Sequence, residues 1–255
     1  ECPPSTISRR YGDEYTGAMK PAGAVLLHGY GVRGYIWGPM QAALDDRLGP
    51  IATPDLEAPS VAELVNKAKA RVRRHSLECD APVAVVGHSL GAVLAAIAAR
   101  DLGPEIVSAA VMLAPPFGDR GRVPGKFLQF LFRRRLIPSI LLRPRFFSSL
   151  TPRTVRRAVF RAAVPESPGI QSLIFEPHWF HSGFFSVPLQ QPSLVIASPA
   201  DRIVPLSQSE EFARTIGART HLFEEAAGVA HDDLFASPEI ASTVAELMIN
   251  FIASA

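Results

Sequence analysis

Cysteine is scarce in this sequence, and the two that occur, Cys2 and Cys79, lie far apart along the 255 residues. Two cysteines cannot build the disulfide framework on which small secreted domains depend. We therefore expect two free thiols, and a single bridge between them stays open as the alternative.

Long apolar runs are also missing. No uninterrupted stretch is long enough to span a bilayer, and no signal peptide is visible. We therefore expect a cytoplasmic protein by default, and the sequence carries no signal for an oligomeric state.

An excess of charge of one sign is absent as well. The formal net charge is +2, so no global electrostatic field argues for a nucleic-acid partner. Histidine, cysteine and acidic residues show no metal-ligand spacing, and no glycine-rich phosphate loop is present. These absences argue against a nucleic-acid-binding protein, a metal centre and a nucleotide site.

Hydrophobic residues make up 47% of the chain, which is enough for one sizeable core. Short apolar runs closed by glycine or proline alternate with segments of helical spacing. The runs lie within 22–31, 49–56, 82–87, 106–116, 192–205 and 219–224, and the helical segments are 38–48, 60–76, 90–102, 206–217 and 238–253. This alternation predicts an α/β fold, with a mostly parallel sheet and helices on both faces.

Residues 117–186 interrupt the alternation. This segment holds twelve Arg or Lys and three Asp or Glu, a net charge of +9 against −7 for the remainder. It is also rich in Phe, Leu and Pro. We expect a core formed by residues 1–116 and 187–255, with 117–186 as a helical cap inserted between them.

The motif Gly87-His88-Ser89-Leu90-Gly91 lies between an expected buried strand and an expected helix. A serine between glycines can form an ordinary tight turn. In a strand–turn–helix setting, however, G-x-S-x-G is the pattern of a nucleophile elbow, because small neighbours let the chain turn sharply and expose the hydroxyl. We predict that Ser89 is a nucleophile and that His88 packs beside it.

A serine nucleophile needs a base, and the base needs an acid that orients it. Asp201 follows one expected strand in "PADRIVP", and His231 follows the next strand in "AGVAHDDLF". Their order after Ser89 predicts a Ser89–Asp201–His231 triad. Asp232 and Asp233 are the alternative acids, and we expect them instead to cap the following turn or to be solvated.

The first expected strand ends in "HGYG", residues 28–31. Gly29 and Gly31 allow a sharp turn there, which exposes backbone N–H groups. We predict that the N–H groups of Tyr30 and Leu90 form an oxyanion hole.

With these pieces the chain resembles the α/β-hydrolase superfamily, in its branch of serine carboxylesterases, lipases and perhydrolases. The resemblance rests on HGYG, GHSLG, DRIVP and AHD in this order, and it covers nearly the whole chain. It implies cofactor-free cleavage of a small ester, by acyl transfer to Ser89 and then to water activated by His231. Relatives commonly carry a G-H-G-x-S loop where this chain has "EAPSVAEL" (57–64), so the substrate's identity is not carried over.

Other functions remain open beside ester hydrolysis. The same triad serves thioesterases, acyltransferases, perhydrolases and hydrolases of carbon–carbon bonds, because fold and triad do not fix the substrate. A ligand-binding protein of the same fold that does not turn over is the alternative of a different class.

The cap offers candidates for the substrate pocket. Phe127 and Phe130 have helical spacing, and His178 and His181 lie further along. Arginines cluster at 133–135 and again at 153–157. We expect the apolar side of the cap to line an acyl pocket, and its basic side to bind anionic lipid weakly. Solvated arginines on a cap that only packs on the sheet are the alternative.

Overall fold

The computed structural model describes residues 22–44, 47–118, 144–175, 185 and 187–254. Within them, six strands form one sheet in the order β2-β1-β3-β4-β5-β6, and all neighbouring strands are parallel. The strands are β1 (Ala24–Leu27), β2 (Ile51–Ala52), β3 (Val83–His88), β4 (Val107–Leu113), β5 (Ser193–Ala197) and β6 (Arg219–Leu222). The α/β fold expected from the sequence is confirmed.

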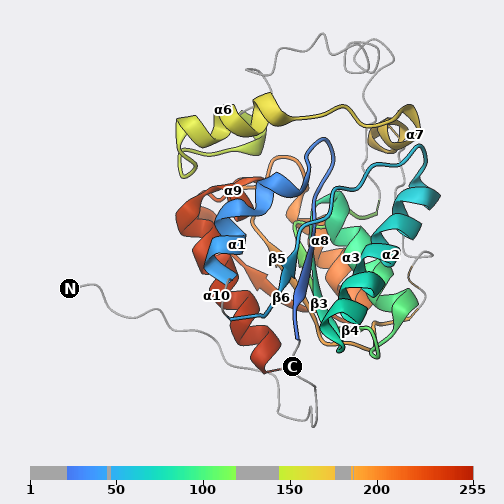
Figure 1. The fold of residues 1–255 in the computed structure, drawn as a ribbon. Helices are drawn as coiled ribbons and strands as arrows, with labels where there is room; N and C mark the ends of the chain where they lie inside the picture. The colour runs from blue at the N-terminus through green and yellow to red at the C-terminus, as the bar shows by residue number, and fades with distance from the viewer. Residues whose placement is uncertain (1–21, 45–46, 119–143, 176–184, 186, 255) are drawn as a thin grey trace.

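Helices cover both faces of this sheet (Figure 1). On one face, α1 (Gly38–Leu44), the short α9 (Asp233–Ala236) and α10 (Pro238–Ala253) enclose a core that contains Trp37 and Phe235. On the other face, α2 (Val61–Cys79), α3 (Leu90–Leu102) and α8 (Leu206–Ile216) enclose a second core, around Phe117 and Phe212. The central strands are buried on both sides, which explains why they read as continuous apolar runs.

Helix boundaries follow local chemistry. Ser60 caps α2, because its side chain accepts a hydrogen bond from the Glu63 N–H at 3.3 Å, as the capping pattern predicts. The helix runs three residues beyond the expected end and stops at Asp80, which adopts φ 49°. The expected strand at 49–56 shrinks to the two residues of β2, and Pro54, two residues later, has no N–H to extend the edge pairing.

The chain reverses direction along the sheet at β1 and β3. From β1 it moves outward to β2, and from β3 it proceeds the opposite way through β4, β5 and β6. Parallel α/β sheets hold their ligands outside the carboxyl ends of the strands at such a switch point. The ends of β1 and β3, where the HGYG and GHSLG motifs lie, are therefore the expected position of a site.

The described part of the segment 117–186 lies over this same edge of the sheet (Figure 1). It contains α6 (Arg153–Ala162), α7 (Pro168–Gln171) and a 3₁₀ turn, η2 (Ser172–Phe175). Val155, Val159 and Phe160 of α6 pack against the core on the α1–α10 face. Phe127, Phe130, His178 and His181 lie outside the described residues, as does Cys2. Among the described residues, no helix combines the length and apolarity needed to cross a bilayer.

Candidate active site

Ser89 occupies the sharp turn between β3 and α3. Its backbone has φ 55° and ψ −121°, a left-handed conformation that costs a non-glycine residue roughly 1–3 kcal/mol. The surrounding structure holds it there, because the Ser89 N–H donates to Leu113 O at 2.8 Å and Ser89 O accepts from the Ala92 N–H. A serine kept in such a conformation at a strand end has its side chain lifted out of the strand.

The two glycines of the motif permit this turn. A Cβ atom at Gly87 would lie 2.0 Å from Gly91 O, and one at Gly91 would lie 2.1 Å from Leu27 O. Both contacts are with backbone, which cannot rotate away. A larger residue at either position would therefore clash with neighbouring backbone, and Gly91 also brings the start of α3 against the end of β1.

His231 and Asp201 lie together in the loops that follow β6 and β5. His231 Nδ1 is 2.6 Å from Asp201 Oδ2, and both side chains are almost fully buried. Asp201 Oδ1 accepts hydrogen bonds from the N–H groups of Ile203 and Val204, which fixes the carboxylate plane. Because Nδ1–H donates to Asp201, the neutral imidazole leaves the lone pair of Nε2 available.

The environment of His231 changes its basicity. Burial alone would lower the pKa of His231, but the charge and hydrogen bond of Asp201, together with the charge of Asp232, raise it above 6.5. A base with a raised pKa holds a transferred proton more readily.

His88 connects this pair to the elbow. Its Nε2–H donates to His231 O at 3.1 Å, and the two rings lie 4.6 Å apart between centroids. The ring of Phe235 contacts His88 from another side. Burial and the neighbouring His231 hold the pKa of His88 well below its usual value, so its ring is neutral. The His88 side chain thus joins the His231 loop to the residue that precedes Ser89.

The two acids after His231 do not contact its Nδ1, and the expectation that they are solvated is wrong. Asp233 is fully buried and accepts hydrogen bonds from Ala230 N–H, Ser148 N–H and Thr151 Oγ1–H. It therefore ties the histidine loop to the segment that begins at 144. The carboxyl of Asp232 is buried too, and burial raises its pKa to about 7.

The loop after β1 is held by a residue to which the sequence motif assigned no role. The Leu56 N–H donates to His28 Nε2 at 2.9 Å, so the proton of this neutral ring is on Nδ1, which donates to Gly29 O at 2.9 Å. Burial lowers the pKa of His28 to about 4, consistent with a neutral ring. Because C=O and N–H point in opposite directions across a trans peptide, this bond turns the Tyr30 N–H away from His28.

The same loop lies against the elbow. A Cβ atom at Gly29 would be 3.2 Å from Ser89 Cβ, so the backbone before Tyr30 passes directly beside the serine. Leu90 is the first residue of α3, and its N–H has no acceptor within the helix. The structure thus brings the loop of Tyr30 and the N–H of Leu90 to Ser89, at the positive end of the α3 dipole.

One wall of the site is aromatic. The ring of Phe146 lies edge-on to His231, with 6.2 Å between centroids, and Phe160 of α6 lies 6.1 Å from Phe146. Sequence patterns did not single out Phe146, which belongs to a short apolar stretch with no periodicity. This wall places an apolar surface next to His231.

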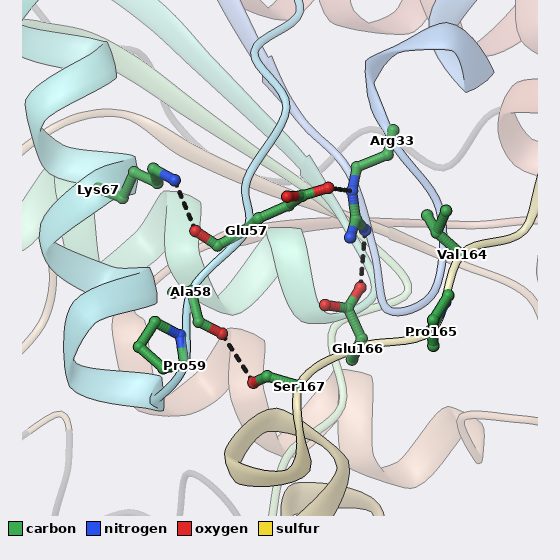
Figure 2. A pocket seen from close by; sticks show the side chains of 9 residues that line it. All are labelled: Arg33, Glu57, Ala58, Pro59, Lys67, Val164, Pro165, Glu166 and Ser167. Carbon is green, nitrogen blue, oxygen red and sulfur yellow. Dashed lines mark hydrogen bonds and ion pairs between the residues drawn. The ribbon is translucent and has the colours of Figure 1, made fainter.

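Two other features need an assignment. Ligand atoms of His88, His231 and Asp232 lie within 4.8 Å of one another, but a cation there would compete with the hydrogen bonds of the two rings, so we assign no metal. A cleft of about 570 Å³ lies between the loop at 57–59 and the segment 164–167 (Figure 2). Its lining contains Arg33, Glu57, Lys67 and Glu166 but not Ser89, Asp201 or His231.

Comparisons with known proteins identify the family and the fold. The sequence matches the Alpha/beta hydrolase family over residues 24–241. No curated protein matches the chain.

Solved structures of similar fold cover most of the chain. A lipase-esterase related protein from Clostridium acetobutylicum shares 17% identity with a TM-score of 0.70, over 92% of this chain and 96% of its own. A thermophilic esterase from Thermogutta terrifontis shares 17% identity with a TM-score of 0.67, over 90% of both chains. BpoC from Mycobacterium tuberculosis, a putative non-heme bromoperoxidase, shares 24% identity with a TM-score of 0.69, over 91% and 92%. At these identities the likeness shows the fold alone.

Proposed function

Because the chain belongs to the alpha/beta hydrolase family, we propose that it is a serine hydrolase that cleaves carboxylic esters through an acyl-enzyme on Ser89. The observation that carries this proposal is the buried 2.6 Å hydrogen bond between His231 and Asp201, in a loop whose His231 carbonyl accepts from the side chain of His88, the residue before Ser89. Ser89, His231 and Asp201 lie in three different loops that follow strands of one parallel sheet, which supports assigning them as nucleophile, base and orienting acid.

The reaction follows from these positions. Ser89 Oγ adds to the ester carbonyl carbon while its proton passes to His231 Nε2, and Asp201 stabilises the imidazolium that forms. The N–H groups of Tyr30 and Leu90 hold the oxygen that becomes negative. Collapse of the intermediate expels the alcohol, which takes the proton from His231. Water then repeats these steps on the acyl-enzyme and releases the acid.

The aromatic wall points to a substrate with an apolar group beside His231. Phe146 and Phe160 would contact that group, so esters of medium acyl chains should be better substrates than acetates. A series of p-nitrophenyl esters of rising chain length measures this preference. A Phe146→Ala variant with the same profile as the wild type would contradict the assigned wall.

The same side chains would also act on thioesters, transfer acyl groups to acceptors other than water, support perhydrolysis or cleave carbon–carbon bonds. Matched esters and thioesters, assayed with water, alcohols and peroxide as acceptors, separate these reactions by their products. A non-catalytic binding protein would bind ligands without releasing any product.

The central test is Ser89→Ala. The hydroxyl lies on an elbow and outside the core, so its removal should leave the circular dichroism and the melting temperature nearly unchanged. Because triad residues act as a unit, we expect a loss of roughly 10⁴-fold or more in kcat, and loss of labelling by a fluorophosphonate probe.

Asp201→Asn should also lose several orders of magnitude in kcat, since the base loses its orienting acid. Asp232→Asn serves as the matched control, because it removes the adjacent carboxyl that does not contact Nδ1. A folded Ser89→Ala protein with near wild-type hydrolysis, or greater damage from Asp232→Asn than from Asp201→Asn, would refute the assignment.

A further inference from the structure

A buried carboxylate joins the segment after α6 to the loop after β1. The side chain of Glu166 is only 5% exposed, and its Oε1 accepts from Gly31 N–H and from Arg33 Nη1–H, each at 2.9 Å. Figure 2 shows this carboxylate pointing at the Arg33 guanidinium, with Glu57 on another side of it. A carboxylate out of water is costly unless its charge is compensated, and here both donors come from one short loop.

Gly31 is fixed from both sides by the same segment. Its carbonyl accepts from the Val164 N–H at 2.9 Å, while its own N–H is held by Glu166. Gly31 has φ 75°, a conformation that favours glycine and that these bonds select. Residues 164–166 thus hold both backbone polar groups of Gly31.

The peptide planes on either side of Tyr30 are thus fixed by different parts of the molecule. His28 holds the carbonyl of the Gly29–Tyr30 peptide, and Glu166 holds the N–H of the Tyr30–Gly31 peptide. Together these planes set the dihedral angles of Tyr30. The Tyr30 N–H lies in the peptide that His28 holds, and Glu166, 136 positions away in the sequence, holds the peptide that follows.

We propose that Glu166 is a positioning residue that aims the Tyr30 N–H at the oxyanion and so couples docking of the 164–167 segment to catalysis. This inference rests on the proposed serine-hydrolase function. The segment 164–167 would then affect the reaction by orienting an oxyanion donor, without contacting the substrate itself.

Arg33 supplies an internal control for this coupling. Its Nε–H donates to Glu57 Oε1 at 3.0 Å, but the Glu57 side chain is 68% exposed. Exposed ion pairs contribute little, and no hydrogen bond joins the Glu57 carboxylate to Gly31 in the described residues. Glu57→Gln removes one negative charge beside Arg33 and leaves every hydrogen bond to the Gly31 backbone in place. It therefore distinguishes the effect of losing a charge beside Arg33 from the effect of moving the loop.

The test compares Glu166→Gln with Glu57→Gln by three measurements: kcat and KM on a p-nitrophenyl ester, and the inhibition constant of a trifluoromethyl ketone. With the ketone, Ser89 Oγ adds to the carbonyl carbon, its proton passes to His231 Nε2, and the ketone oxygen takes the negative charge. Binding of this inhibitor therefore reports on the oxyanion hole directly.

For Glu166→Gln we expect kcat to fall about 10-fold with KM nearly unchanged, because one donor is misdirected rather than removed. The inhibition constant should rise by a similar factor, while Glu57→Gln stays within about 2-fold of the wild type in all three quantities. Unchanged kcat and inhibition in a folded Glu166→Gln protein would overturn the proposal. A rise in KM alone would also overturn it, since that would mean a role in substrate binding.

Hydrogen exchange of the peptide that covers residues 28–34 keeps the test independent of activity. Faster exchange there in Glu166→Gln than in Glu57→Gln supports the coupling, and equal exchange refutes it. If Glu166→Gln does not fold, Glu166→Asp, which keeps the charge but shortens the reach, carries the same comparison. A wild type that neither hydrolyses esters nor labels with fluorophosphonate would refute the proposed function, while the exchange result still decides whether Glu166 holds the loop.

Discussion

At the scale of single residues, His231 is subject to opposing influences. Burial lowers its pKa, while Asp201 raises it through charge and a 2.6 Å hydrogen bond, and the balance lies above 6.5. Asp232 adds to the increase, and its own carboxyl has a pKa of about 7 because it is buried. His231 and Asp232 each feel the charge of the other, so the apparent pKa of the site belongs to the pair rather than to the histidine alone.

This balance predicts the pH dependence of kcat/KM. The base acts in its neutral form, so activity should fall on the acid side of an apparent pKa that lies above 6.5. In Asp232→Asn a negative charge near the imidazole is lost, so the acid limb should move to lower pH. Glu105→Gln, an exposed change elsewhere, should leave the limb in place. An acid limb that moves to higher pH in Asp232→Asn, or a flat profile down to about pH 4, would mean that another base operates.

The choice among three aspartates also shows what a sequence can decide at this scale. The spacing of Asp201 and His231 predicted their pairing, because both follow consecutive strands and parallel strands end at one edge. Asp233 was expected to cap the following turn or to be solvated, yet it lies buried and bonded to Thr151, 82 positions away. Only the folded chain brings these groups together, so no local pattern could reveal the bond.

At the scale of elements, the β3–α3 turn is determined almost entirely by local sequence. A buried strand, two glycines and an alanine-rich helix leave one sharp turn with an exposed residue between them. The structure places the strand at Val83–His88 and the helix at Leu90–Leu102, close to the predicted 82–87 and 90–102. Prediction succeeded here because the constraint is steric and lies within nine residues.

Gly87→Ala should therefore break the turn. The new Cβ would lie 2.0 Å from Gly91 O, so either the strand end or the start of α3 must move. We expect a loss of more than about 3 kcal/mol in the free energy of unfolding, and loss of fluorophosphonate labelling in whatever protein still folds. Urea denaturation and the labelling rate measure these effects.

Gly38→Ala is the matched control for this substitution. Nothing lies within 4 Å of a Cβ atom at Gly38, and its φ of −48° suits any residue. This change should stabilise the protein by about 0.4–1 kcal/mol and leave labelling unaltered. Equal effects of the two substitutions would show that the crowding at Gly87 is relieved without cost.

The elements of the segment 117–186 were less predictable. Its arginines and aromatic residues indicated short helices, and α6 has the expected alternation of basic and apolar sides. The contacts that attach it to the core, from Asp233 to Ser148 and from Glu166 to Gly31, join residues 85 and 135 positions apart. Such pairs leave no periodic signal in a single sequence.

At the scale of the whole molecule, charge is unevenly distributed. Residues 144–165 contain five arginines and no acidic residue, and four of these arginines are on α6. Within the described residues, none of the five forms an ion pair, while Val155, Val159 and Phe160 of α6 turn toward the core. The apolar side of α6 thus packs on the core and leaves Arg153, Arg157 and Arg161 on an exposed basic side. The helix itself lies over the edge of the sheet where β1 and β3 end (Figure 1).

We propose that this basic side attracts anionic lipid surfaces by charge alone. Each arginine near such a surface contributes about 1 kcal/mol, and the attraction decays within a Debye length of roughly 10 Å at 0.1 M salt. The protein should therefore sediment with phosphatidylserine vesicles at low salt and dissociate at high salt.

Replacing Arg153 and Arg157 by Gln should weaken sedimentation, whereas replacing Arg71 and Arg73 of α2, an equal change in net charge, should not. Equal sedimentation with neutral vesicles, or equal effects of the two pairs, would mean that these arginines are merely solvated. The outcome decides whether the arginines of α6 orient the protein with its proposed active site toward an anionic membrane or only improve its solubility.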